Sequence, residues 1–370
     1  MPANDFLYQK VYDGVLLALR QGKLTAGQKL PSAEQLMAEY AVSRITVNKA
    51  LSLLVEEGRI RRVPGVGSFV QPQEASTTAG RKPSKLIGIV LEHVSSPFGL
   101  AMMYHLDLCA ARNGYKTILR FSLGDRERET EEIDFLTGLG IDGLIIMPCH
   151  GRHYNPALLK LYLKHFPIVM VDKNMQGIGL PSVRTDNEGA VQTLVGTLFA
   201  QGCRCMAFLT SDDTNAISVR ERRKGFINGI DAVGAAEAGI VPLPLKNSEK
   251  EFLSAQANSA VKEEIHRFLA ARSVELDAIV CGEYSIAAPL VAACRAEGLL
   301  PERGIRIATI DEDYLAPEGY HFLHMKQDEI AIAEKAVELL LSQLHERPVV
   351  KENYLIPAIL CKQRPFALLD

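Results

Sequence analysis

C-terminal to residue 85, short runs of apolar residues alternate with longer stretches of helical periodicity. Most runs are continuous, which is typical of strands buried on both faces of a sheet. The predicted strands are 87–91, 116–121, 143–147, 167–171, 206–209, 278–281 and 306–310, and the predicted helices are 99–112, 187–200, 219–232, 257–271, 284–297 and 327–344. Such alternation favours parallel sheets with right-handed crossovers. Because about 285 residues are too many for one such sheet, we expect two lobes.

The first 70 residues show a different pattern, in which three short helices precede a glycine-rich hairpin. An amphipathic helix is predicted over 7–21, and Gly22 suits its end. A second helix follows in KLPSAEQLMAEY, because Ser32 and Gln35 have the spacing of a capping box. Ser43 is a good N-cap for a third helix, whose buried face is predicted to be Val47, Ala50, Leu51 and Leu54.

The third helix has the polar face that a DNA recognition helix needs. Its first residues would reach base edges and phosphates in a major groove, where Arg44 suits a guanine and Asn48 an adenine. Groups for phosphates come from Ser43, Thr46 and Lys49. The following RIRRVPGVGSFV predicts two short strands, with glycines that let the turn approach a sugar-phosphate backbone. The predicted DNA-binding residues are Ser32, Ser43, Arg44, Thr46, Asn48, Lys49, Arg61, Arg62, Gly65 and Gly67.

Charge is distributed unevenly along the chain. Residues 1–72 hold 9 basic and 6 acidic residues, whereas the remainder holds 32 basic and 38 acidic residues. A basic first segment on an acidic body suggests a polyanion as partner of the first segment only. Together with the helix pattern, this predicts double-stranded operator DNA as a partner.

Residues 71–84, QPQEASTTAGRKPS, have no apolar periodicity and are rich in small polar residues. This composition is typical of a linker. The predicted domains are therefore a winged helix-turn-helix at 1–70, a linker at 71–84 and a two-lobed effector-binding domain at 85–370 that also forms a homodimer. A homodimer would set two recognition helices in successive major grooves of a near-palindromic site.

Polar side chains follow the predicted strands of the large domain. In parallel α/β sheets, ligands bind beyond the carboxyl ends of the strands. Carboxylates, hydroxyls and basic groups at these ends suit a polyhydroxylated ligand, since sugar hydroxyls need both donors and acceptors. The predicted ligand-binding residues are Ser95, Phe98, His150, Asp172, Lys173, Ser218, Arg222, Glu283, Asp311 and Gln327.

Two family resemblances cover almost the whole chain. Residues 7–70 resemble the GntR-family winged helix-turn-helix through KLPSAEQLMAEYAVSRITVNKALSLLVEEGRI and PGVGSFV. Residues 85–368 resemble the ligand-binding domain of the lactose/ribose repressor family, itself similar to periplasmic sugar-binding proteins. Its marks stand in order as KLIGIV…SSPF, GIDGLIIMP, PIVMVDK, VRTDNEGA, SVRERRKGF, DAIVCGE, IRIATIDED and HMKQDEIA. The implied fold is multidomain, with a winged helix-turn-helix followed by a two-lobed α/β periplasmic-binding-protein-like domain with parallel sheets.

The resemblances imply particular contacts and show departures from them. The DNA contacts of the GntR family fall on Ser43, Arg44, Thr46, Asn48 and Gly65, and the effector contacts of the repressor family fall on Phe98, Asp172, Ser218, Arg222, Glu283, Asp311 and Gln327. Many GntR members carry Arg at the positions of Glu34 and Asn48. The repressors commonly have Asn-Asp where this chain has Gly282-Glu283, and the chain has no Trp on which a sugar could stack. The operator sequence and the identity of the effector therefore stay open.

Two other functions compete with a sugar-responsive repressor. A sugar-active enzyme is disfavoured, because the sequence has no nucleophile elbow, phosphate-binding loop, HExxH motif or dinucleotide fingerprint. An exported sugar-binding protein would leave residues 7–70 unexplained, and MPANDFLYQK does not resemble a signal peptide. The seven cysteines show no zinc-site spacing. We therefore expect a cytoplasmic, non-enzymatic protein with no metal, no cofactor and no membrane association.

Overall fold

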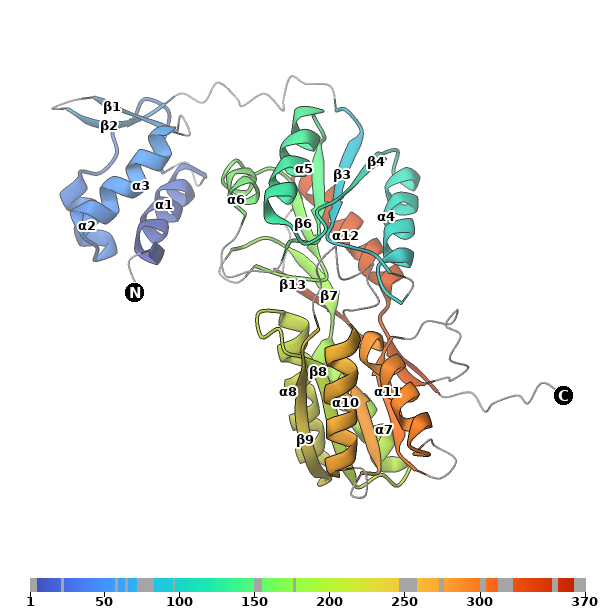
Figure 1. Cartoon of the computed structure of the whole chain (residues 1–370). Helices are drawn as coiled ribbons and strands as arrows, with labels where there is room; N and C mark the ends of the chain where they lie inside the picture. Colours follow the sequence, from blue (N-terminus) through green and yellow to red (C-terminus); the bar gives the residue numbers. More distant parts are fainter. Residues whose placement is uncertain are drawn as a thin grey trace. The chain divides into compact units, whose positions relative to one another are not determined.

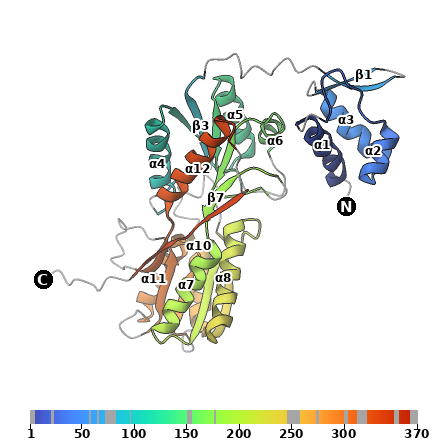
Figure 2. The same ribbon diagram turned by 180° about the vertical axis from the view of Figure 1, so that it is seen from behind.

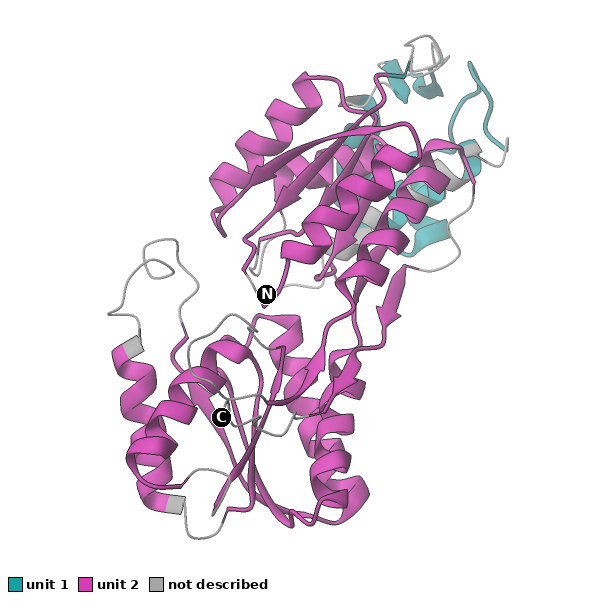
Figure 3. Cartoon of the chain, turned by 90° about the vertical axis from the view of Figure 1, so that its right-hand side faces the viewer, with its two compact units in different colours: residues 1–83 teal, residues 84–370 magenta. Residues whose placement is uncertain are grey.

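The computed structural model of the chain forms two compact units, residues 1–83 and 84–370 (Figure 3). It describes residues 5–20, 23–56, 59–63, 66–71, 83–95, 97–149, 155–175, 178–245, 258–272, 276–299, 304–311, 322–347 and 352–362. The predicted linker at 71–84 lies almost entirely outside the described residues, so its boundaries stay a prediction.

The first unit is a three-helix bundle with a two-stranded hairpin, as the sequence predicted. Its elements are α1 (Asp5–Arg20), α2 (Ala33–Tyr40), α3 (Arg44–Glu56), β1 (Ile60–Val63) and β2 (Gly67–Val70). The strands β1 and β2 pair antiparallel. The predicted capping box is present, since Ser32 Oγ accepts from Gln35 N at 3.2 Å and Gln35 Oε1 accepts from Ser32 N at 2.7 Å. The predicted buried face of α3 lies in the core, with Val47, Ala50, Leu51 and Leu54 all buried.

The second unit consists of two α/β lobes (Figure 1). Lobe 1 is built on a parallel sheet in the order β13-β7-β6-β5-β3-β4. Its elements are β3 (Leu86–Leu91), α4 (Leu100–Arg112), β4 (Lys116–Phe121), α5 (Arg126–Gly138), β5 (Gly143–Ile146), α6 (Pro156–Leu163), β6 (Ile168–Val171), β7 (Ser182–Thr185), α12 (Glu329–Leu344) and β13 (Asn353–Ile356).

Lobe 2 repeats this plan with the order β14-β12-β11-β10-β8-β9. Its elements are α7 (Asn187–Ala200), β8 (Cys205–Ser211), α8 (Ile217–Val233), β9 (Ala236–Leu243), α10 (Asn258–Arg272), β10 (Ala278–Cys281), α11 (Tyr284–Ala296), β11 (Arg306–Ile310), β12 (Leu323–Lys326) and β14 (Ile359–Cys361). All neighbours in this sheet are parallel except β12 and β14. The two-lobed parallel architecture predicted from the sequence is confirmed.

Three crossovers join the lobes. The chain passes from β7 to α7 through Asp186, returns from β12 to α12 through 327–328, and passes again from β13 to β14 through 357–358. Helix α12 therefore lies beside α4 in lobe 1, although it follows lobe 2 in the sequence (Figures 1 and 2). Asp186 N donates to Ile356 O at 2.9 Å, which ties the first crossover to the third. Because β7 and β12 leave their parallel sheets here, the carboxyl ends of the parallel strands in both sheets point to the crossovers.

Candidate DNA-binding and effector sites

The amino end of α3 carries an exposed, mostly polar surface. Arg44 is its first residue, and its Nη2 lies 3.5 Å from Glu34 Oε1 on α2, with both side chains 68% exposed. Asn48 lies one turn further on, where its Oδ1 accepts from Arg62 Nη2 of β1 at 3.0 Å. The guanidinium of Arg62 thus connects the hairpin to the predicted recognition helix. The amide oxygen of Asn48 has a second lone pair and its amide nitrogen two donors, so the predicted contact with an adenine stays a prediction.

Thr46 is held by Ser43 at the start of α3. It is only 5% exposed, and its Oγ1 lies 2.8 Å from Ser43 Oγ. Ser43 Oγ also accepts from Thr46 N at 3.3 Å, as an N-cap does. The hydroxyl of Thr46 therefore stabilises the start of α3, and its contact with a phosphate stays a prediction.

The other predicted DNA-binding residues are spread over the helix starts and the hairpin. Ser32 is exposed, but its side chain is engaged in the capping box of α2. Arg61 is exposed and lies over the ring of Phe69 at 5.5 Å, and the Nζ of Lys49 lies 4.1 Å from the centre of the Tyr8 ring. Gly67 has a φ of 134°, a conformation that favours glycine at the end of the turn. Gly65 lies outside the described residues.

In the large unit, one aspartate in each lobe stands at the same point of the fold. Asp172 follows β6 and Asp311 follows β11, and their φ values are 63° and 60°. Asp172 N donates to Val183 O and Asp311 N to Met325 O, each at 2.9 Å. A non-glycine residue in the left-handed region is uncommon, although Asp tolerates it better than most, and such residues cluster at functional sites. Both carboxylates stand at the edge of the sheets where the crossovers run.

Asp311 belongs to a buried polar chain that links two crossovers. Its Oδ1 accepts from Gln327 N at 3.0 Å, and its Oδ2 accepts from Gln327 Nε2 at 2.6 Å. Gln327 Oε1 in turn accepts from Thr185 Oγ1 at 2.7 Å. Burial raises the pKa of Asp311 to about 6, opposed by the hydrogen bonds from Gln327 and the positive charge of Arg222. The predicted site residues Asp311, Gln327 and Arg222 are thus brought together.

Arg222, on α8, is fixed by two acceptors from other parts of lobe 2. Its Nε donates to Asn187 Oδ1 and its Nη1 donates to Gly282 O, each at 2.8 Å. Ser218 lies one turn earlier on the same helix, and Glu283 directly follows the carbonyl that Arg222 contacts. A planar guanidinium held in this way still offers donors to a ligand oxygen.

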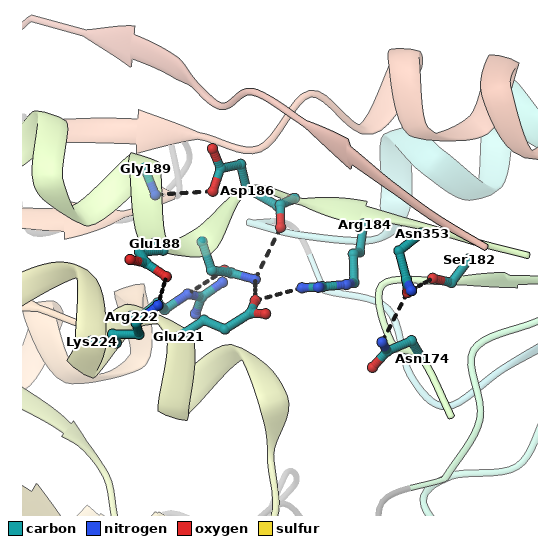
Figure 4. Close-up of polar contacts among 12 residues, drawn as sticks. Asn174, Ser182, Arg184, Asp186, Glu188, Gly189, Glu221, Arg222, Lys224 and Asn353 are labelled. Atoms are coloured by element: carbon teal, nitrogen blue, oxygen red, sulfur yellow. Dashed lines mark hydrogen bonds and ion pairs between the residues drawn. The ribbon is translucent and has the colours of Figure 1, made fainter. Parts of the chain in front are cut away.

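An ion pair that the sequence did not predict lies beside this group (Figure 4). Arg184 of β7 in lobe 1 donates from Nη1 to Glu221 Oε2 of α8 in lobe 2 at 2.5 Å. The amide of Asn187 lies 3.5 Å from the same carboxylate oxygen. Within the described part of the chain, Nε of Arg184 is buried and has no hydrogen-bond partner. The only signal in the sequence was a charged residue inside the short buried strand SVRT.

The remaining predicted ligand residues lie in lobe 1. Ser95 and Phe98 close a tight turn after β3, with Ser95 N donating to Phe98 O at 2.8 Å. Phe98 is partly buried against the core of the lobe. Lys173 is buried and ion-paired with Glu92, so its charge is compensated within lobe 1, and its contact with a ligand stays a prediction. His150 lies outside the described residues.

Two family models match this chain. Residues 7–70 match the bacterial regulatory proteins of the gntR family, and residues 84–340 match the periplasmic binding proteins and sugar binding domain of the LacI family. The chain belongs to the LacI-type sugar-binding family and carries a GntR DNA-binding domain. It is a transcription regulator with a DNA-binding unit and an effector-binding unit.

Relatives of this GntR–LacI regulator cover most of its length. It is 25% identical to an arabinose metabolism transcriptional repressor of Geobacillus stearothermophilus, over 93% of each chain. A periplasmic binding protein/LacI transcriptional regulator from Alkaliphilus metalliredigens, solved in complex with D-xylulofuranose, has a TM-score of 0.60 at 20% identity and covers 76% of this chain and 98% of its own. The trehalose repressor from Escherichia coli has a TM-score of 0.59 at 17% identity, covering 75% and 99%. These structures share the fold of the large unit.

The described residues of the regulator contain neither a candidate membrane span nor a candidate metal site. None of its described helices is long and apolar enough to cross a membrane. No group of three or more His, Cys, Asp or Glu side chains in the described ranges could hold a metal ion.

Proposed function

We propose that this regulator represses carbohydrate-utilisation genes and that a sugar or sugar derivative, bound between its two lobes, changes its affinity for operator DNA. The observation that carries the proposal is the polar group formed by Asp311, Gln327 and Arg222 at the crossovers. Similarity to arabinose repressors over 93% and 84% of the chain supports the same class of effector.

The residues at the crossovers supply both kinds of group that a sugar requires. The carboxylates of Asp172 and Asp311 accept hydrogen bonds from ring hydroxyls, and the guanidinium of Arg222 donates to hydroxyl or ring oxygens. Ser218 and Glu283 add a hydroxyl and a third carboxylate close to Arg222. A ligand that contacts residues of both lobes binds one relative orientation of the lobes better than others and therefore favours it.

The proposed regulation passes from the lobes to DNA through a homodimer of the large units. Each winged helix-turn-helix presents the amino end of α3 to one half of a near-palindromic site. A change in lobe orientation would alter the separation of the two DNA-binding units and hence operator affinity. The coupling is reciprocal, so operator DNA must change the affinity for the effector by the same factor.

The regulator is proposed to act in the cytoplasm as a binding protein and not as an enzyme. Support comes from its named relatives, which are transcriptional repressors. Incubation of the purified protein with each sugar that it binds, followed by chromatography of the sugar, should recover that sugar unchanged.

A thermal-shift screen against pentoses, hexoses, their acids and their phosphates tests the proposed function. We expect at least one compound to raise the melting temperature and to change the anisotropy of a labelled operator duplex bound by the protein. Binding of a sugar without any effect on operator affinity would contradict the proposed coupling between the two units.

A further inference from the structure

Glu34 places a negative charge beside Arg44, on a surface that is proposed to contact DNA. Glu34 is the second residue of α2 and Arg44 the first residue of α3, and their charged groups approach to 3.5 Å. A carboxylate that faces a duplex repels phosphates and lowers affinity for any sequence. An arginine at a helix amino end is also opposed by the helix dipole. Glu34 therefore weakens non-specific binding to DNA, and Arg44 lowers the stability of α3.

Helix α2 itself gives one reason for a carboxylate at position 34, which lies in its first turn. The pKa of Glu34 is lowered by a backbone hydrogen bond at the start of α2, by the Ser32 side chain and by the charge of Arg44. A carboxylate in the first turn of a helix is favourable by itself. Stabilisation of α2 alone would not, however, make operator recognition depend on Glu34.

The contact leaves Arg44 able to read a base. A guanidinium has five N–H donors in a fixed plane, and the contact with Glu34 involves Nη2 alone. The remaining donors suffice for bidentate contact with O6 and N7 of guanine. An arginine that is 68% exposed has many rotamers in the absence of a partner, so a carboxylate on the neighbouring helix reduces the entropy lost when the guanidinium meets a base.

We propose that Glu34 determines operator specificity as a positioning residue, by orienting the guanidinium of Arg44 towards one guanine, while its own charge repels the phosphates of every duplex alike. The inference rests on the proposed contact between the amino end of α3 and DNA. The base that Arg44 contacts is a guanine in the major groove of a duplex. Glu34 acts through Arg44 and contributes no attraction to DNA.

The test begins with selection of the operator by the full-length wild-type protein from random duplexes. Anisotropy titrations then compare the selected duplex with an unrelated duplex for wild type, Glu34→Gln, Glu34→Asp and Glu39→Gln. Glu39 is an exposed carboxylate on the same helix, so its variant removes an equal charge without removing the partner of Arg44. Replacement of each operator guanine by 7-deazaguanine removes the N7 acceptor and locates the base that Arg44 contacts.

For Glu34→Gln we expect tighter binding to the unrelated duplex by about two- to fivefold, since one repulsive charge is gone. The ratio of specific to unrelated affinity should fall by about tenfold or more, and the 7-deazaguanine that weakens wild type by about tenfold should weaken this variant by less than about threefold. The Glu39→Gln variant should change both affinities together and keep the ratio. Glu34→Asp retains the carboxylate and should keep most of the discrimination.

The inference is overturned if Glu34→Gln, with a melting temperature like that of wild type, keeps the wild-type ratio and the full 7-deazaguanine effect. It is also overturned if a poorly folded Glu34→Gln is accompanied by a well-folded Glu34→Asp that has lost discrimination. Selection of no sequence by the wild-type protein would instead refute DNA recognition itself.

Discussion

Arg184 and Glu221 form an ion pair that joins lobe 1 to lobe 2, with 2.5 Å between Nη1 and Oε2. The two partners differ in exposure, since the side chain of Arg184 is 8% exposed and that of Glu221 is 24% exposed. An unpaired charge is costly where water cannot reach it. Removal of Arg184 and removal of Glu221 should therefore lower the free energy of unfolding by different amounts.

Removal of Glu221 should destabilise the regulator more than removal of Arg184. We expect Glu221→Gln to lower the free energy of unfolding by about 2 kcal/mol, because a buried guanidinium loses its counter-charge. Arg184→Met leaves the more exposed carboxylate and should cost less. Urea unfolding of both single variants and the double variant gives the coupling energy. Equal losses from the two single variants would show that the pair is effectively solvated.

Asp311 should make stability depend on pH in a definite direction. Burial raises the pKa of Asp311 from 3.8 to about 6, so the folded protein binds this proton more tightly than the unfolded chain does. Its contribution to stability is therefore fully present below about pH 4 and is lost as pH rises through about 6.

The variant Asp311→Asn removes this dependence. It should gain free energy of unfolding relative to wild type as pH rises from about 4 to about 7, by up to about 3 kcal/mol. Gln327 can rotate its amide to match the new side chain. Chemical denaturation at several pH values measures the difference between the two proteins. A difference that stays constant with pH would contradict the raised pKa of Asp311.

Arg222 should be essential for the response to an effector. In Arg222→Ala, the donors that would meet a sugar oxygen are lost, and Asn187 and Gly282 lose their partner. We expect the sugar-induced thermal shift to disappear while affinity for the operator without sugar stays within about twofold of wild type. The matched control is Arg223→Ala, which removes an exposed arginine from the next position. An unchanged shift in Arg222→Ala would show that the effector binds elsewhere.

Glu329 should be important for the stability of lobe 1. Its Oε2 accepts from Gly99 N and Met102 N, each at 2.8 Å, and so caps α4 from a distant part of the chain. Gly99 at the N-cap position has no side chain to do this. Because Glu329→Ala leaves two buried N–H groups without an acceptor, we expect a loss of about 3 kcal/mol. Glu334→Ala, on the exposed side of α12, should change stability by less than about 0.5 kcal/mol in the same urea titration.

Most of the strands that were predicted from the sequence have continuous apolar runs, and the charged residues within 116–121 make it an exception. Helix α5 was missed because two of its buried positions are glutamates, which conceal its apolar face. Glu132 is paired with Arg120 of β4, and Glu129 accepts from Cys149 N at 2.6 Å. Partners from distant parts of the chain make these burials possible, and no local pattern shows them. Strand β7 was missed because Val183 is the single apolar residue of SVRT, which leaves no apolar run to detect.

In the candidate site, too, the positions of residues at strand ends could be predicted from the sequence, whereas side-chain contacts could not. The positions of Asp172 and Asp311 were predictable, because the carboxyl ends of parallel strands meet at one edge. The engagement of Lys173 with Glu92, and of Thr46 with Ser43, depends on side-chain geometry that strand and helix patterns do not contain. Arg184 and Glu221 belong to different lobes, so their contact arises only when the crossovers are formed.

The third crossover has a consequence for how the protein is made. Both sheets receive their last strand from residues 353–361, as β13 joins β7 and β14 joins β12. During synthesis, neither lobe can complete its sheet until residues 353–361 have left the ribosome, and both keep an unpaired strand edge until then. The helix-turn-helix unit is continuous in sequence and can fold early. A premature stop before residue 353 would therefore leave a folded DNA-binding unit attached to two incomplete, aggregation-prone lobes.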